Sequence, residues 1–274
     1  MSTPRSCFAG VDSGSWTTKA VVMDAAGDIL GSSVVRSGAD LAGAADTAYA
    51  EALAAAGMAV HDVVSVWATG FGRGAIAFAD GSRTELDCHA RGVRRFVTGA
   101  VTVVDIGGQD AKVIKLDDSG RRISHRMNRK CAAGTGSFID EMALRLNVGI
   151  GDLPDLASGF REELELGSFC TVFSATELLA AIRRGHRPAD LARAAYKSVV
   201  KRVLEMEVLD HTVVATGGVV AHHPMVVSLL EEAIGKPVAV PPFAQEMGAL
   251  GAATAAREAS LATSHARENP GGDV

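Results

Sequence analysis

The sequence has few aromatic residues, few cysteines and no long apolar run, and each shortage excludes a class of protein. Aromatic residues make up 5% of the 274 residues, whereas Gly and Ala are abundant. Helical patterns alternate with short Val- and Ile-rich runs, which favours an α/β protein. Four cysteines without close pairing are a poor disulfide framework, so we expect a reducing, cytoplasmic compartment. No stretch resembles a signal peptide or approaches the roughly 18 apolar residues of a membrane span.

The charge is weakly negative and of mixed sign. The formal net charge is -5, and the basic clusters 91–95 and 183–187 are short enough to be solvated helix faces. A nucleic-acid surface is normally a strongly basic patch. We therefore expect neither a nucleic-acid partner nor a membrane partner.

A strand that ends in aspartate, a Gly-containing turn and a second strand occur twice, about ninety residues apart. The first copy covers 8–12 and 19–24, and the second covers 101–105 and 111–116. This pattern indicates an internal duplication of one ββ unit. Further strands are expected at 29–36, 63–68, 123–127 and 211–215, and helices at 41–56, 137–147, 175–184, 189–206, 224–234 and 245–257.

The duplication divides the chain into two halves. We expect residues 1–98 to form the N-terminal half and residues 99–258 the C-terminal half. The remaining segment, 259–274, is polar and contains Pro270-Gly271-Gly272. We expect it to be a disordered tail.

The two turns have the chemistry of phosphate-binding loops. Glycine allows backbone N–H groups to approach phosphate oxygens closely, and an aspartate at each strand end, Asp12 and Asp105, can hold a hydrated Mg²⁺ or orient an attacking water. Lys19 is placed to meet phosphate charge, and Gly217-Gly218 after a later strand would lie under the adenosine. No Gly-x-Gly-x-x-Gly turn follows the first strand, and no Walker lysine loop is present. The other residues expected at the phosphates are Ser13, Gly14, Ser15, Thr17, Thr18, Gly107 and Gly108.

Cys131 and Cys170 each precede an expected helix. A thiolate at a helix N-terminus is stabilised by the helix dipole and the free N–H groups. A four-iron cluster needs about four thiolates, so two copies of the chain would supply them and the count suggests a symmetric dimer. Cys7 and Cys88 are expected to be core residues instead, and His89 a capping or core residue.

The chain resembles the superfamily of acetate and sugar kinases, Hsp70 and actin, which implies a duplicated ribonuclease-H-like α/β fold of two packed halves with ATP in the cleft between them. More specifically, it resembles the ATP-dependent activators of 2-hydroxyacyl-CoA dehydratases and the related ATPase subunits of benzoyl-CoA reductase. The resemblance covers about 7–256 and rests on the strings at 11–15, 68–73, 85–90, 105–112, 130–136, 170–173, 217–219 and 248–252.

The resemblance implies a role for each site residue. Asp12 and Asp105 hold Mg²⁺ and orient the attacking water, and Gln109 lines the phosphates together with the glycines. Cys131 and Cys170 ligate one [4Fe–4S] cluster per homodimer. ATP hydrolysis to ADP moves the cluster helices and drives an electron, received from ferredoxin or flavodoxin, into a partner iron–sulfur acyl-CoA dehydratase. Alternatives are a benzoyl-CoA reductase subunit, a small-molecule kinase of the same superfamily, and a nucleotide-binding redox sensor without turnover.

Overall fold

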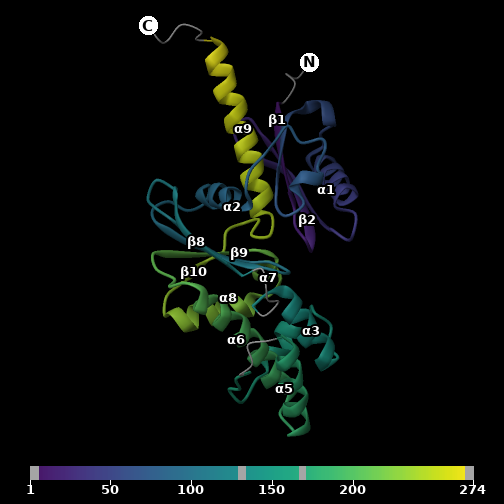
Figure 1. Cartoon of the computed structure of the whole chain (residues 1–274), viewed down its shortest axis with the longest axis vertical. Helices are drawn as coiled ribbons and strands as arrows, with labels where there is room; N and C mark the ends of the chain where they lie inside the picture. Colours follow the sequence, from purple (N-terminus) through teal and green to yellow (C-terminus); the bar gives the residue numbers. More distant parts are fainter. Residues whose placement is uncertain (1–5, 129–133, 167–170, 269–274) are drawn as a thin grey trace. The chain divides into compact units, whose positions relative to one another are not determined.

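The chain forms two compact units, each built around one five-stranded mixed sheet (Figure 1). The computed structural model describes residues 6–128, 134–166 and 171–268. The first unit contains the described residues of Met1–Val97 and Glu246–Val274, and the second contains those of Thr98–Gln245.

The first unit has the sheet order β3-β2-β1-β4-β5. Its three N-terminal strands pair antiparallel, and β4 and β5 continue from β1 in parallel. The strands are β1 Cys7–Ser13, β2 Thr17–Asp24, β3 Ile29–Arg36, β4 Val63–Thr69 and β5 Gly81–Ser82.

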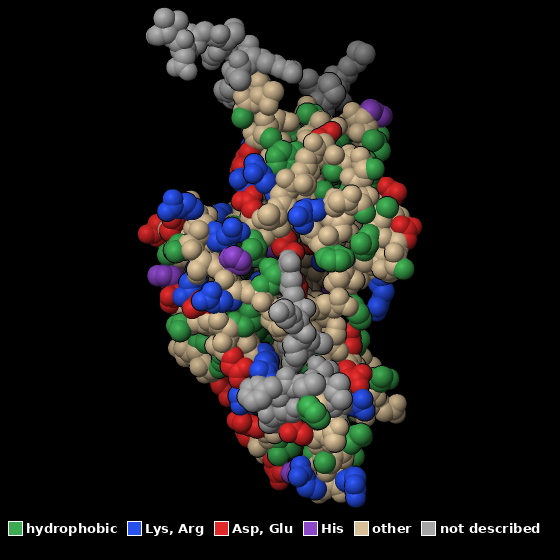
Figure 2. All heavy atoms as spheres, in the orientation of Figure 1, with side chains coloured by type: hydrophobic (Ala, Val, Ile, Leu, Met, Phe, Trp, Pro, Cys, Tyr) green, Lys and Arg blue, Asp and Glu red, His purple; other side chains and the backbone are tan. Residues whose placement is uncertain are grey.

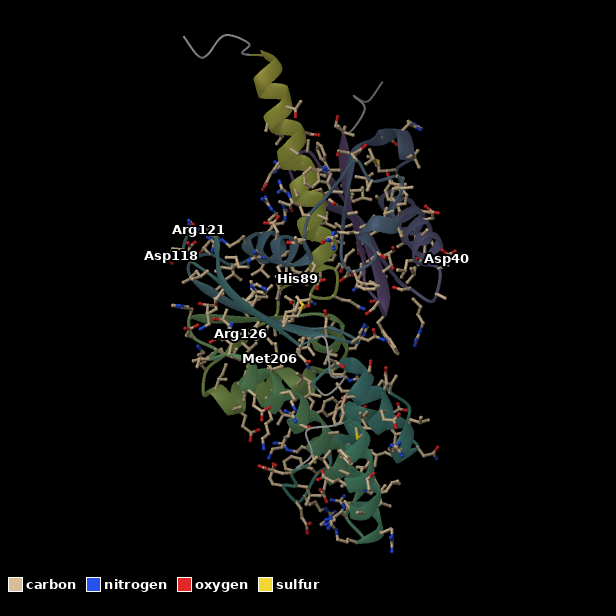
Figure 3. All side chains as sticks on the ribbon, in the orientation of Figure 1. Asp40, His89, Asp118, Arg121, Arg126 and Met206 are labelled. Atoms are coloured by element: carbon tan, nitrogen blue, oxygen red, sulfur yellow. The ribbon has the colours of Figure 1, made fainter. Side chains whose placement is uncertain are left out.

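Helices cover both faces of this sheet. The helices are α1 Leu41–Ala56, α2 Glu85–Arg94 and α9 Met247–Glu268, with short 3-10 turns at Val60–Asp62 and Arg73–Ala75. Successive side chains of a strand point to opposite faces. Ala9 of β1 therefore joins α1 in one apolar core, whereas Gly10 faces the backbone of α9. Asp40 begins α1 by accepting a hydrogen bond from the Gly43 N–H at 2.9 Å (Figure 3), and Thr84 caps α2 in the same way.

The second unit repeats this sheet. Its order is β10-β9-β6-β7-β8, with β6, β7 and β8 antiparallel and β9 and β10 continuing in parallel. The duplicated fold expected from the sequence is therefore confirmed. The strands are β6 Val101–Ile106, β7 Ala111–Leu116, β8 Arg122–Asn128, β9 Thr212–Thr216 and β10 Val238–Ala239.

The helices of the second unit bury one face of its sheet. Val104, Ile106 and Val113 pack in one apolar core with Phe138 of α3 and Tyr196 of α6. The helices are α3 Gly136–Leu146, α4 Leu153–Ser158, α5 Thr171–Arg183, α6 Pro188–Met206, α7 Gly218–His222 and α8 Pro224–Ile234.

The C-terminal helix differs from the expected division of the chain. Residues 246–258 were expected in the second half, and 259–274 were expected to be disordered. Instead α9 is helical through Glu268 and belongs to the first unit. The physical reason is its small-residue face: Gly251 lies against the Cys88 backbone of α2, and Arg257 donates to the Ala25 carbonyl at 2.7 Å.

The surface carries charges of both signs. Figure 2 shows Lys and Arg side chains interspersed with Asp and Glu on the face drawn. Among the described residues, no helix has the length and apolarity needed to cross a membrane.

Gly251→Ala tests the close approach of α9 to α2. A Cβ at Gly251 would overlap the Cys88 carbonyl oxygen, a backbone atom that cannot rotate away. We expect a loss of about 1–3 kcal/mol of stability, measured as a lower thermal midpoint. Gly74→Ala is the matched control because a Cβ there has nothing within 4 Å. An equal midpoint for the two variants would contradict the packing.

Candidate functional site

The two units place an aspartate, a lysine and a threonine at equivalent positions of their sheets. In the first unit Asp12 is the register partner of Lys19 on β2 and of Thr69 on β4. In the second unit Asp105 is the partner of Lys112 on β7 and of Thr216 on β9. The duplication therefore extends from the strands to the polar side chains at their ends.

The threonine in each unit is followed by a glycine in the left-handed region. Gly70 has φ 89° and Gly217 has φ 97°. A Cβ on Gly70 would meet the Ser13 carbonyl oxygen at 2.6 Å, and one on Gly217 would meet the Ile106 carbonyl oxygen at 2.4 Å. Only glycine fits here, because both the backbone conformation and the space exclude a side chain.

In the first unit, the side chains at the turn are loosely paired. Lys19 Nζ lies 3.5 Å from Asp12 Oδ2, and the two side chains are 15% and 10% exposed. The Gly14 N–H donates back to the Asp12 and Thr17 carbonyls, both at 3.2 Å. Ser13 is buried, and its Oγ has no hydrogen-bond partner in the described structure. Ser15 is exposed and Thr17 is half-buried.

In the second unit, the equivalent side chains are tightly paired. Lys112 Nζ lies 3.0 Å from Asp105 Oδ2 and 2.9 Å from Asp110 Oδ1, and Thr216 Oγ1 lies 3.0 Å from Asp105 Oδ1. The side chains of Lys112 and Asp105 are each 4% exposed. The turn between them leaves Gly107 and Gly108 half-buried and Gln109 exposed.

The turn in the second unit is bonded directly to the start of α3. The Gly136 N–H donates to the Gly107 carbonyl at 2.9 Å, and the Ser137 N–H donates to the Gly108 carbonyl at 2.8 Å. The Ser137 hydroxyl also donates to the Gly108 carbonyl, at 2.6 Å. The helix after Cys131 therefore begins on the candidate phosphate turn.

Helix α6 contacts chain segments that flank the predicted cysteine ligands. Cys131 and Cys170 themselves lie outside the described residues. A Cβ on Gly134 would meet Arg202 Cβ of α6 at 2.7 Å. Asp190 of α6 accepts from the backbone N–H of Arg161 at 2.6 Å, and this hydrogen bond holds the pKa of Asp190 below its ordinary value.

The other two cysteines are core residues. Cys7 and Cys88 are buried thiols, and burial raises the pKa of Cys88 to about 12. A thiol must lose its proton to ligate a metal, so Cys88 is a poor ligand. His89 is also buried. Within the part of the chain that the structure describes, no cluster of three His, Cys, Asp or Glu side chains is arranged for a metal ion.

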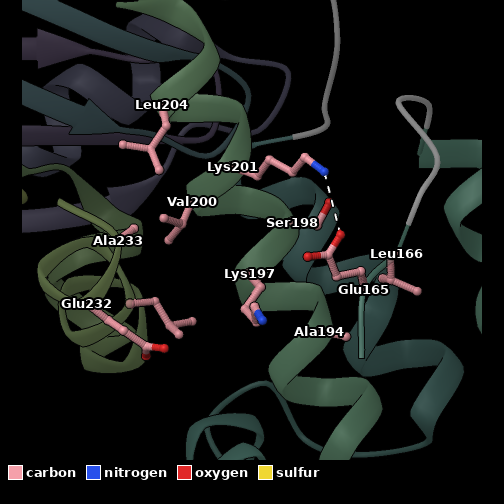
Figure 4. A pocket seen from close by; sticks show the side chains of 11 residues that line it. Glu165, Leu166, Ala194, Lys197, Ser198, Val200, Lys201, Leu204, Glu232 and Ala233 are labelled. Atoms are coloured by element: carbon pink, nitrogen blue, oxygen red, sulfur yellow. Dashed lines mark ion pairs between the residues drawn. The ribbon is translucent and has the colours of Figure 1, made fainter. Parts of the chain in front are cut away.

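A separate pocket of about 260 Å³ lies between α6 and α8 (Figure 4). Its apolar floor includes Val200 and Leu229, and Lys201 forms an ion pair with Glu165 at 3.8 Å at its rim. None of the residues at the two turns lines it. It is therefore distinct from the candidate phosphate site.

Two units with the same sheet order and equivalent aspartate-containing turns are typical of the actin, Hsp70 and sugar-kinase class of folds. A solved structure of a ROK family glucokinase from Streptomyces griseus, in complex with glucose and AMPPNP, shares this fold with a TM-score of 0.57 at 16% identity. It covers 92% of this chain and 99% of that chain.

The chain belongs to the BadF/BadG/BcrA/BcrD ATPase family, whose model matches residues 9–256. It is 37% identical to the (R)-2-hydroxyglutaryl-CoA dehydratase activating ATPase of Acidaminococcus fermentans over 89% of this chain and 94% of that protein. The structure of the activator of 2-hydroxyisocaproyl-CoA dehydratase from Clostridium difficile with bound ADPNP is similar with a TM-score of 0.88 at 34% identity, covering 94% and 97% of the two chains. A benzoyl-CoA reductase subunit of Thauera aromatica is 27% identical over 76% of this chain and 77% of that protein.

Sequence reasoning missed Lys112, Asp110 and Thr216 as parts of the site. The available signal was the repeated spacing, because Lys112 follows Asp105 by the same interval that separates Lys19 from Asp12. Neighbouring antiparallel strands joined by turns of equal length place these pairs in register.

Thr216→Val and Thr69→Val form a matched test of the second-unit pairing. Removing the Thr216 hydroxyl leaves a buried Asp105 oxygen without its donor, which costs about 1–3 kcal/mol. Thr69 Oγ1 has no hydrogen bond of standard geometry, and its polar neighbour is the Cys88 thiol, a weak donor. We expect a lower thermal midpoint for Thr216→Val and little change for Thr69→Val. Equal decreases of the thermal midpoint in the two variants would contradict the stronger side-chain pairing of the second unit.

Proposed function

We propose that this ATPase is an electron donor that activates a partner acyl-CoA dehydratase. The similarity to dehydratase activators runs through nearly the whole chain. The structural observation that carries the proposal is the hydrogen bonding of Gly136 and Ser137 to the Gly107-Gly108 turn. It joins a phosphate turn to the helix that follows a predicted cluster ligand, Cys131.

The residues at the two turns have the chemistry needed to bind Mg²⁺ and a nucleoside triphosphate. No side chain fits at Gly217, where a Cβ would meet the Ile106 carbonyl oxygen at 2.4 Å, so the backbone there stays bare for a ligand, and carboxylates are the ligands that Mg²⁺ prefers. We assign Asp12 and Asp105 to the hydrated Mg²⁺ and the attacking water. We assign Ser13, Gly14, Ser15, Thr17, Lys19, Gly107, Gly108 and Gln109 to the phosphates, and Gly217 and Gly218 to the adenosine.

We propose that Cys131 and Cys170 ligate a [4Fe–4S] cluster shared by two copies of the chain. Cys7 and Cys88 are buried in the hydrophobic core, which leaves two thiols per chain. Two chains together would supply the four thiols that a cluster needs. Helix α5 begins at Thr171, directly after Cys170. A helix N-terminus stabilises an anion through its dipole and free N–H groups.

The protein residues would couple the nucleotide to the cluster through one short path. The turn formed by Gly107 and Gly108 would line the phosphates, while the carbonyls of these two glycines accept from Gly136 and Ser137 of α3. A shift of the turn on exchange of ATP for ADP would therefore move the first turn of α3. When bound, the cluster would supply the low-potential electron, replenished by ferredoxin or flavodoxin in the reducing cytoplasm.

The alternatives have less support. A role in a benzoyl-CoA reductase is the second candidate because the Thauera aromatica protein matches, although at lower identity than the dehydratase activators. The likeness to the ROK glucokinase shows the fold alone. A small-molecule kinase would not need Cys131 or Cys170, and a redox sensor would not release phosphate.

Cluster stoichiometry tests the proposal directly. We expect anaerobically prepared protein to contain about four irons per two chains, measured by iron analysis and visible absorption. Cys131→Ser or Cys170→Ser should abolish the absorption because each removes two of the four ligands from the dimer.

Cys88→Ser is the matched control, because this thiol is buried and its pKa is raised. It should keep the cluster. An intact visible spectrum in Cys131→Ser would contradict the assignment, and wild-type protein that forms no cluster on anaerobic reconstitution would favour the kinase class.

A further inference from the structure

Lys112 is a buried cation between two carboxylates at the second phosphate turn. Its ammonium lies 3.0 Å from Asp105 and 2.9 Å from Asp110. Asp105 lies near the end of β6 and Asp110 immediately precedes β7, so the lysine spans the two ends of the turn. The Gly107 N–H closes the same turn by donating to the Asp110 carbonyl at 2.9 Å.

The equivalent lysine of the first unit does not have this arrangement. In the described residues Lys19 forms an ion pair with one carboxylate, Asp12, at 3.5 Å. Both lysines occupy the same register position, opposite the aspartate near the end of the first strand of each copy. The duplicated sites therefore have the same backbone plan but different charge pairing.

An ammonium and a divalent cation compete for the same place. Mg²⁺ and Mn²⁺ bind carboxylate oxygens at little more than 2 Å. Lys112 Nζ stands within hydrogen-bond distance of both Asp105 Oδ2 and Asp110 Oδ1. Asp110 is 26% exposed, so ions in solvent can reach the turn, but an ammonium already contacts both carboxylates.

We propose that Lys112 acts as a built-in cation that keeps divalent metal out of the second phosphate turn, so that metal enters only with nucleotide and on the Asp12 side. Lys112 is thus a positioning residue, and the inference rests on the proposed nucleotide function of the two turns. Asp105 then stays bonded to Lys112 and Thr216 and is available to a water, whereas Asp12 is loosely held by Lys19 and can serve the hydrated metal.

Calorimetric titration of the full chain with Mn²⁺, under anaerobic conditions and without nucleotide, tests the proposal. Lys112→Met removes the charge and keeps the side-chain length, so the ammonium that contacts both Asp105 and Asp110 is gone. We expect Lys112→Met to bind Mn²⁺ at least about tenfold more tightly than the wild type, because affinity follows the charge of the ligand set. Lys112→Arg keeps the charge and should not gain this binding.

Two further variants identify the oxygens. The double variant Lys112→Met/Asp110→Asn should lose the new Mn²⁺ site, because one carboxylate of the pair is gone. Lys19→Met should gain no comparable site, because Lys19 is paired with one carboxylate. A folded Lys112→Met protein that binds Mn²⁺ no better than the wild type would overturn the proposal.

A second measurement is independent of the folding of Lys112→Met. In the presence of ADP, Asp12→Asn should weaken Mn²⁺ binding at least about tenfold, and Asp105→Asn should weaken it less than about threefold. Equal losses would overturn the division of roles. Failure of ADP to bind to the wild type would instead refute the proposed function, and the nucleotide-free titration would still report on Lys112.

Discussion

The first turn of α3 donates its backbone N–H groups to the carbonyls of the Gly107-Gly108 turn. The first N–H groups of any helix have no partner inside the helix, and the Thr135 side chain does not cap this one. The turn therefore acts as the cap, through Gly136 and Ser137. Because breaking these hydrogen bonds would leave N–H groups of the first turn unpaired, we expect the turn and the helix to move together. This constraint connects the proposed phosphate turn to the helix that begins at Gly136.

The duplication explains why there are two such turns and why they differ. Both units repeat the same strand order, the same aspartate–lysine register and the same left-handed glycine after a threonine. In the described structure the lysine of the second unit, Lys112, forms short ion pairs with two carboxylates. A turn fixed in this way is suited to transmit a displacement, whereas the looser pairing of Asp12 and Lys19 leaves ligand-binding groups available.

Much of the fold could be predicted from the sequence because its signals are local. Strands that end in aspartate and the helix starting near Gly136 follow from periodicity and glycine placement, and the structure has them within one or two residues. By contrast, the element against which a helix packs is not determined by the local sequence. The sequence pattern of 247–268 does not show that Gly251 packs against Cys88 rather than on the second sheet.

The backbone positions of the candidate site residues were predictable to the same extent. Asp12 and Asp105 were expected near strand ends before glycine turns, and the structure has them there. The pairing of Lys112 with Asp110 was not, because it depends on how the 107–110 turn folds back on itself. The bond of Ser137 to Gly108 joins residues 29 positions apart, and only the folded chain shows it.

The most direct test of the central claim is the rate at which a chelator removes iron from the proposed cluster with ADP or with a non-hydrolysable ATP analogue bound. If the Gly107-Gly108 turn moves α3, the two nucleotides should give different rates in the wild type. The difference should shrink in Ser137→Ala, which loses the hydroxyl bond to Gly108. Identical rates in the wild type, with both nucleotides shown to be bound, would contradict the coupling.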